Sequence, residues 1–146
     1  MNGYRFHRDD GLPFSGSIFV FESNFEGDHS QSADGLLATR CFGARNGKGE
    51  GLSGSSYALP TTIRGHALPL HNIMAHILFL HNSALFHAEK EFFIPATLGR
   101  TAGYSTSDIA PLFSGLAENL VFPSSWQRII GERRSPAQIR KFAMMY

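Results

Sequence analysis

The residues best suited to chemistry in this sequence lie in three polar loops. They are residues 22–33, 46–56 and 96–105. The first loop opens with Glu22-Ser23-Asn24 and is acidic, the second holds four glycines and three serines in eleven positions, and the third contains Gly99 and Gly103. Glycine and serine let a backbone approach a phosphate and offer it N–H groups, so the loops favour a nucleotide site. Their spacing matches neither the P-loop nor the dinucleotide fingerprint, which leaves flexible turns as the open alternative.

A sheet with helices on both faces is the scaffold that would bring such loops together. Short apolar runs predict strands at 17–21, 57–60, 91–95 and 119–123. Apolar residues at helical spacing predict helices at 34–42, 70–88 and 106–116. Strands that alternate with helices favour a mostly parallel sheet, so the predicted fold class is a three-layer α/β domain. In such sheets ligands bind beyond the carboxyl ends of the strands, where we expect the three loops to meet.

Length and charge narrow the class of protein. A chain of 146 residues with 42% apolar residues predicts one domain, with a core at 17–126 and extensions at 1–16 and 127–146 that either fold against it or swap between subunits. Thirteen basic and twelve acidic side chains nearly cancel, so the charge favours neither nucleic acid nor an anionic membrane as partner. No apolar run approaches the roughly 20 residues that span a bilayer, and we expect a soluble, cytoplasmic protein.

Neither a metal nor a cofactor is expected. The single cysteine, Cys41, excludes an internal disulfide framework and a cysteine-based zinc site. Five histidines follow one another at nearly regular spacing, at positions 66, 71, 76, 81 and 87. On a helix a step of five residues rotates a side chain by roughly 140°, so neighbouring histidines do not share a face. We interpret them as solvated or capping residues.

Several motifs, in order, resemble one known family. Residues 18–24 read IFVFESN and residues 49–61 read GEGLSGSSYALPT, followed by AGY at 102–104 and DIAPLF at 108–113. These segments are similar to a macrodomain-like family of bacteria and their phages, whose members typically read IFVFGSN and GEGLxGxSYAIPT. The resemblance covers roughly residues 17–126 and identifies the chain as a divergent member.

The resemblance implies a cleft for ADP-ribose or a related NAD-derived nucleotide. The implied ligand-binding residues are Ser23, Asn24, Gly27, His29, Gly49, Glu50, Gly51, Gly54, Ser55, Gly103 and Tyr104. Among them, the Asn24 amide is expected to pair with a ribose or base while backbone amides of the second loop hold the diphosphate. Binding without turnover is favoured. If the protein is an enzyme, it is an ADP-ribosyl hydrolase in which Asp28, His29 and Glu50 are proton-transfer candidates by position only.

The sequence departs from the family pattern in the loops themselves. Glu22 stands where the family has glycine and Asp28 where it has arginine, while Ser30 and Ser32 replace glycines. Carboxylates at these places repel a diphosphate. The alternative is therefore a phage or mobile-element module that inhibits a host defence or nucleic-acid-handling complex. Its protein-binding surface would be the acidic cluster Glu22, Glu26, Asp28 and Asp34.

Overall fold

Five parallel strands form the centre of the molecule. The structure is a computed structural model, and it describes residues 3–131. They run in the order β1 (Arg5–His7), β7 (Leu120–Pro123), β6 (Phe92–Phe93), β2 (Ile18–Asn24) and β4 (Ser56–Ile63). Two short strands, β3 (Gly51–Ser53) and β5 (His66–Ala67), pair with β4 in the antiparallel sense. Because β2 lies between β6 and β4, its carboxyl end is flanked by the loops that follow both neighbours.

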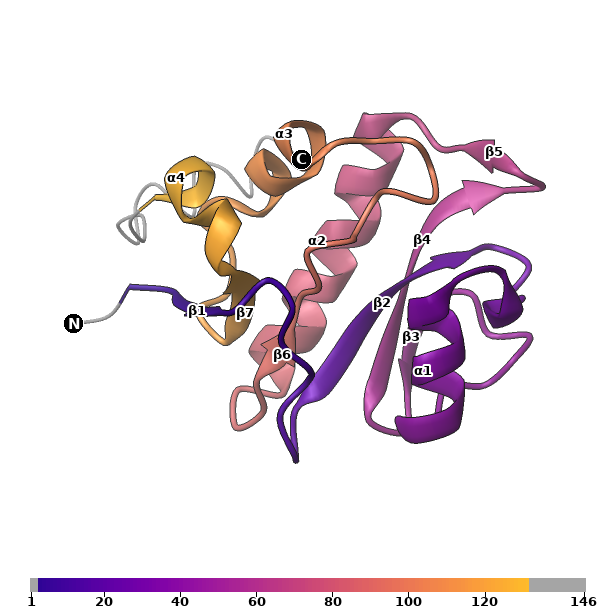
Figure 1. Ribbon diagram of the computed structural model, residues 1–146, viewed down its shortest axis with the longest axis horizontal. Helices are drawn as coiled ribbons and strands as arrows, with labels where there is room; N and C mark the ends of the chain where they lie inside the picture. Colours follow the sequence, from indigo (N-terminus) through magenta and orange to yellow (C-terminus); the bar gives the residue numbers. More distant parts are fainter. Residues whose placement is uncertain (1–2, 132–146) are drawn as a thin grey trace.

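Helices cover both faces of this sheet, as Figure 1 shows with α1 in front and α2 behind. The α-helices are α1 (Ala33–Cys41), α2 (Leu70–Phe86), α3 (Thr106–Ile109) and α4 (Gln127–Ile130). Three 3₁₀ turns, η1 (His29–Gln31), η2 (Ala110–Phe113) and η3 (Ser124–Trp126), complete the described elements. The predicted fold class, a three-layer α/β domain with a mostly parallel sheet, is confirmed.

The alternation of side chains along β2 explains why it is the central strand. Ile18 and Val20 pack into the larger core beneath α2, whereas Phe19 and Phe21 pack into the smaller core beneath α1. All four are at most 7% exposed. In the sequence such a strand is a continuous apolar run, because neither of its faces is exposed to solvent. The run ends at Glu22, where the sheet meets the loops.

The amino-terminal segment is part of the sheet, which answers the question that the sequence left open for it. Arg5 pairs with Val121 and His7 with Pro123, so β1 is an edge strand parallel to β7. Tyr4 is 7% exposed and its hydroxyl donates to the Leu116 carbonyl at 2.6 Å. The described start of the chain is therefore integral to the core. Residues 132–146 of the predicted basic extension lie outside the described residues.

Two predicted elements differ from the observed ones. The helix expected at 106–116 divides into α3 and η2, because Pro111 has no N–H to donate and the chain tightens into a 3₁₀ turn around it. Its cap is Ser105, which forms a capping box with Asp108, rather than one of the next three residues. The second loop, expected to be irregular throughout, contributes β3 to the sheet edge. Within residues 3–131 no helix has the length and apolar character to span a membrane.

His81 on α2 generates a prediction about pH. Its Nδ1 accepts the Ala117 N–H at 3.0 Å, which requires a neutral ring, and burial lowers the pKa of the imidazole below its usual 6.5. The unfolded chain therefore binds more protons, so this contribution to stability is complete above about pH 6.5 and is lost as the pH falls below it. We expect His81→Asn, whose Oδ1 can accept the same N–H, to lose less stability on acidification than the wild type does, because asparagine does not titrate.

Chemical denaturation at pH 7.0 and 5.5 measures this difference. His71→Asn is the matched control, because His71 is exposed on the same helix. Equal pH dependence in the wild type and His81→Asn would contradict the assignment.

Candidate functional site

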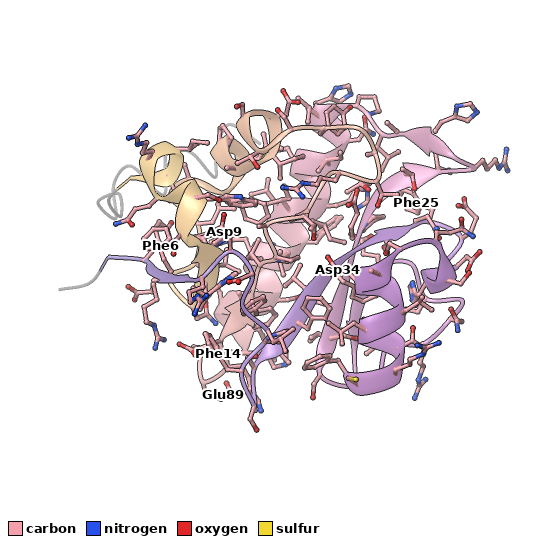
Figure 2. The ribbon with its side chains drawn as sticks, in the orientation of Figure 1. Phe6, Asp9, Phe14, Phe25, Asp34 and Glu89 are labelled. Carbon is pink, nitrogen blue, oxygen red and sulfur yellow. The ribbon has the colours of Figure 1, made fainter. Side chains whose placement is uncertain are left out.

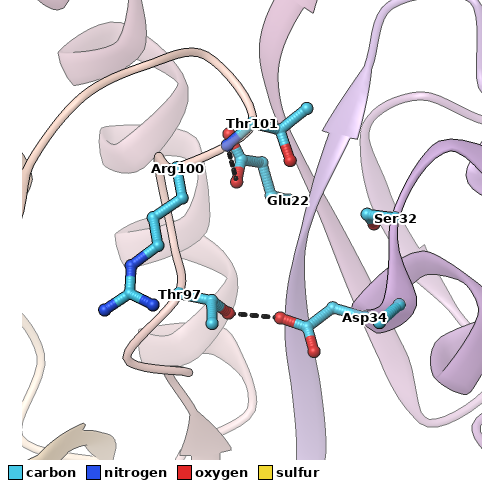
Figure 3. Close-up of a pocket in the computed structure, with 7 residues that line it drawn as sticks. Glu22, Ser32, Asp34, Thr97, Arg100 and Thr101 are labelled. Carbon is cyan, nitrogen blue, oxygen red and sulfur yellow. Dashed lines mark hydrogen bonds between the residues drawn. The ribbon is translucent and has the colours of Figure 1, made fainter.

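Three adjoining cavities line the carboxyl edge of the sheet and form one groove, which we call the carboxyl-edge groove. The middle cavity, of about 180 Å³, lies between β2 and the loop after β6 (Figure 3). It shares Thr101 with a cavity of about 270 Å³ beside Asn24, and Asp34 and Thr97 with one of about 200 Å³ at the other end. The side chains around it come from segments far apart in sequence, as Figure 2 shows for Asp9 and Asp34. The predicted location of the site therefore contains a groove.

Glu22 lies at the centre of this groove with its carboxylate fully hydrogen-bonded. Its Oε1 accepts the N–H groups of Gly99 at 3.0 Å and Thr101 at 3.2 Å. Its Oε2 accepts the Ala102 N–H at 3.2 Å and the Thr61 hydroxyl at 2.6 Å. The residue is only 8% exposed, so a buried negative charge is balanced here by neutral donors. Glu22 does not contribute to an acidic surface.

The loop after β6 is shaped so that its amides converge on one point. Gly99 and Gly103 adopt positive φ angles of 93° and 87°, and a Cβ on Gly99 would lie 2.5 Å from the Ile109 side chain. Glycine is the residue that takes this conformation without strain. Leu98 anchors the loop in the core and the Tyr104 hydroxyl donates to the Leu68 carbonyl at 2.6 Å. Tyr104 and Gly103 thus hold the loop rather than face the groove.

The Asn24 side chain lines the groove but is already engaged. Its Nδ2 donates to the Asp28 carbonyl at 3.0 Å and its Oδ1 accepts the Asp28 N–H at 2.8 Å. The Asp28 carboxylate in turn caps η1, accepting from Ser30 and Gln31. Hydrogen bonds from the Ser30 side chain, then from Gln31 and the Ser30 backbone, lower the pKa of Asp28. Asn24 and Asp28 are both at the groove, as predicted, and together they fold the first loop.

His29 points into the protein, away from the predicted role. It is 3% exposed, its Nε2 lies 2.8 Å from the Arg45 carbonyl and its ring packs edge-on against Phe21. Its backbone N–H donates to Asn46. The histidine therefore connects the first loop to the second, and the structure does not bring it together with Asp28 and Glu50.

Two glycines of the second loop, Gly49 and Gly54, lie directly against backbone, and Gly47 is hydrogen-bonded to it. Gly47 donates its N–H to the Gly27 carbonyl at 2.9 Å, and a Cβ on Gly27 would lie 2.5 Å from the Gly47 carbonyl carbon. Ser23 donates its hydroxyl to the Gly49 carbonyl, and a Cβ on Gly49 would overlap the Asn24 carbonyl. Gly54 packs in the same way on the residues after α1, Ser55 donates its N–H to Phe42, and Gly51 is part of β3. Ser23, Gly27, Gly47 and Gly49 therefore join the two loops, whereas Gly54 and Ser55 join the second loop to the end of α1.

Glu50 forms a separate polar cluster with α2. Its Oε2 lies 2.6 Å from Nδ1 of His76, and both side chains are less than a third exposed. Burial and the nearby Glu50 carboxylate raise the pKa of Tyr57 to about 12, so its phenol stays protonated at neutral pH. Glu50 is not among the residues that line the carboxyl-edge groove.

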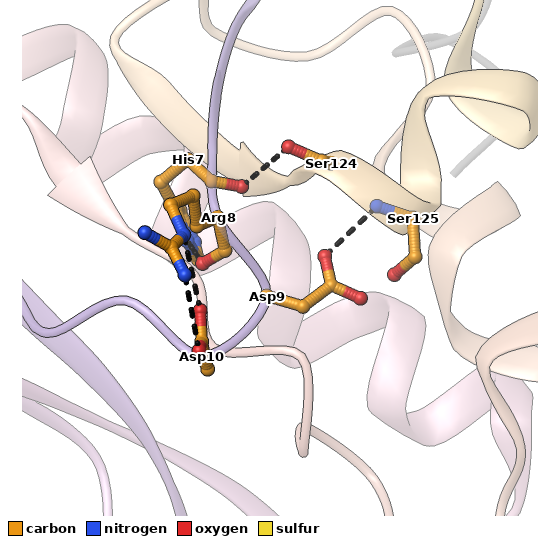
Figure 4. A network of polar contacts seen from close by, with 6 residues as sticks. All are labelled: His7, Arg8, Asp9, Asp10, Ser124 and Ser125. Atoms are coloured by element: carbon orange, nitrogen blue, oxygen red, sulfur yellow. Dashed lines mark hydrogen bonds and ion pairs between the residues drawn. The ribbon is translucent and has the colours of Figure 1, made fainter.

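The far end of the groove was not predicted. It begins with Asp9 and Asp10, which follow β1 (Figure 4). Asp9 accepts the Ser125 N–H at 2.9 Å, and hydrogen bonds from Ser125, through its side chain and then its backbone, lower the pKa of Asp9. Thr97 donates its hydroxyl to Asp34 and bridges the groove. The sequence signal for Asp9 was its place after a short strand, which the alternation Tyr4-Arg5-Phe6-His7 indicates only weakly.

The charge of the groove is strongly one-sided. Six carboxylates line it, belonging to Asp9, Asp10, Glu22, Glu26, Asp28 and Asp34. Of the described residues that line it, Arg100 alone is basic. Two of the four acidic residues expected to form a protein-binding surface are not fully exposed, since Glu22 is buried and Asp34 is half-buried and bonded to Thr97. Glu26, which accepts the Arg64 N–H at 2.9 Å, and Asp28 remain on the rim.

Comparisons with known proteins do not assign the chain to a family. Comparison of the chain with protein families, curated proteins and solved structures finds no match. The macrodomain-like resemblance therefore stays a prediction. In residues 3–131 no group of three or more His, Cys, Asp or Glu side chains is arranged to hold a metal ion.

The stability costs of substituting Gly27 and Gly47 test the packing of the first two loops on each other. Both Gly27 and Gly47 have positive φ, 74° and 93°, but a Cβ on Gly47 would meet nothing within 4 Å. We expect Gly47→Ala to destabilise the fold by about 1 kcal/mol, the cost of the left-handed conformation. Gly27→Ala adds an overlap with backbone and should cost roughly 3 kcal/mol. Urea denaturation measures both, and equal losses would contradict the packing described here.

Proposed function

We propose that the carboxyl-edge groove binds ADP-ribose or a related NAD-derived nucleotide. The observation that carries the proposal is the groove itself, which lies beyond the carboxyl ends of the central parallel strands, where α/β sheets bind ligands. The resemblance of residues 17–126 to macrodomain-like sequences supports the choice of nucleotide. We propose the cytoplasm as the location, in keeping with a chain that has one cysteine and hence no internal disulfide.

The lining chemistry favours the sugar and base over the diphosphate as the main contacts. Carboxylates accept hydrogen bonds from ribose hydroxyls and from an exocyclic amine, and the cavity of about 270 Å³ offers Glu26 and Asp28 beside Asn24 and Thr62. The same carboxylates repel phosphates, which leaves Arg100 as the group that favours them. Because attraction and repulsion oppose each other, we expect a dissociation constant between about 10 µM and 1 mM for ADP-ribose.

We propose that the protein binds its ligand without turning it over. The three proton-transfer candidates are dispersed: Asp28 caps η1, His29 is buried against Phe21 and Glu50 pairs with His76. General acid–base catalysis needs a group within hydrogen-bond reach of the reacting atom. The arrangement therefore supports a binding domain more than an ADP-ribosyl hydrolase.

Recognition of a host protein is the second candidate, supported by the acidic rim. Glu26 and Asp28 are both exposed at the end of the groove. A partner for this rim would present Lys or Arg, and its association would slow as salt is added. A nucleotide whose contacts are mainly neutral would bind with little dependence on salt.

Titration calorimetry with ADP-ribose and with adenosine tests the nucleotide proposal. We expect Arg100→Ala to weaken ADP-ribose binding about tenfold, since one charge-assisted hydrogen bond is lost, and to leave adenosine binding unchanged. Arg40→Ala is the control, because Arg40 is an exposed arginine on α1 that lines no cavity of the groove. Absence of heat with ADP-ribose, NAD and adenosine at millimolar concentration would refute the proposal.

A further inference from the structure

The donors around Glu22 form a binding site in their own right. We infer that the amides of Gly99, Thr101 and Ala102, with the hydroxyl of Thr61, are an oxyanion site whose resident ligand is the Glu22 carboxylate. Two donors serve each carboxylate oxygen, and all four lie between 2.6 and 3.2 Å from it. Converging backbone N–H groups of this kind recognise small anions, including carboxylates and phosphates, by geometry and dipole rather than by net charge.

The loop provides these donors independently of the strand that provides the ligand. Gly99 and Gly103 set its path, Leu98 anchors it in the core and Tyr104 fastens it to the Leu68 carbonyl. None of these interactions involves Glu22. The amides therefore remain directed at the same point when the carboxylate is removed, and three N–H groups without a partner, that of Gly99 in the interior, favour any anion that can reach them.

Space for an external anion exists beside the site. Glu22→Ala removes four heavy atoms, which is enough to admit formate, and the adjoining cavity of about 180 Å³ leaves room for the further atoms of phosphate. Thr101, Arg100 and Asp34 line that cavity, and the Thr97 hydroxyl is already donated to Asp34, so an entering anion would meet one hydroxyl and a guanidinium beside one carboxylate. The site thus suits a small oxyanion, either inorganic phosphate or the phosphate of a larger ligand.

Glu22 consequently determines which ligands the groove accepts. A carboxylate tethered to β2 competes with every free anion for the same donors and is always present at high effective concentration. In the wild type the phosphate of a ligand is excluded from this point, and the ligand must place its anionic group elsewhere. This consequence for specificity rests on the proposed nucleotide function, whereas the oxyanion site itself does not.

Thermal unfolding of Glu22→Ala in increasing phosphate, at constant ionic strength with potassium chloride, tests the inference. We expect a saturable rise in Tm of roughly 3 to 5 °C at ten times the half-saturating concentration. Formate should give a smaller saturable rise. The wild type and Glu26→Ala should show only the shallow, equal response of any protein to phosphate. Glu26→Ala is the matched control because the exposed Glu26 carboxylate accepts one backbone amide, whereas the buried Glu22 carboxylate accepts three.

A response of Glu22→Ala no larger than that of Glu26→Ala overturns the inference. If Glu22→Ala fails to fold, Glu22→Gln decides, because it keeps the shape and directs an N–H at the amides. We expect its Tm to fall by at least about 5 °C, against less than about 2 °C for Glu26→Gln. A Glu22→Gln protein as stable as the wild type would show that the donors do not require an anion.

The two proposals fail separately. Phosphate binding by Glu22→Ala without ADP-ribose binding by the wild type would retain the oxyanion site and reject the nucleotide function. The reverse result would retain the nucleotide function and reject the oxyanion site.

Discussion

The carboxylate of Glu22 is the interaction on which the carboxyl edge of the sheet depends. It joins three segments, which are the end of β2, Thr61 on the neighbouring strand β4 and the loop at 99–102. A buried charge is tolerated only where its hydrogen bonds are complete, and here four donors meet it. Because all of β2 before Asn24 is buried, the position of the carboxylate is set by the core, and it meets a loop whose path is set by Gly99, Gly103 and Leu98. The groove follows from that arrangement.

Glycine-rich loops serve two purposes that look alike in a sequence. A glycine allows close approach, and what approaches is either a ligand or another stretch of backbone. In this protein Gly27 and Gly49 let the first two loops pack on each other. The third loop uses Gly99 and Gly103 to direct amides at an anion, but the anion belongs to the chain. The residue types predicted an anion-binding backbone, and only the spatial neighbours reveal which loop has one.

The distinction between local sequence pattern and spatial neighbours also explains which features could be predicted from the sequence. The long amphipathic helix and the apolar strands were predictable because burial imposes a period on each of them. Short edge strands such as β1 have no such period, so the Asp9 end of the groove was missed. The location of the site followed from sheet topology, whereas the orientation of His29 and Glu50 depended on tertiary partners, Phe21 and His76, that no local pattern identifies. Glu22 was noticed as a departure from a family pattern, but its donors lie 39 and more residues away.

The distribution of charge limits what the groove can hold. Hydrogen bonds from Ser30 and Gln31 lower the pKa of Asp28, and those from Ser125 lower the pKa of Asp9, so both ends of the groove stay negative at any physiological pH. The centre holds a third negative charge, that of Glu22, and the four hydrogen-bond donors around it are already occupied. A ligand with one anionic group can therefore place it only near Arg100, between the centre and the far end. Its neutral or cationic parts must extend toward Asn24 or toward Asp10, and this polarity, more than the volume of the cavities, defines the class of molecule that fits.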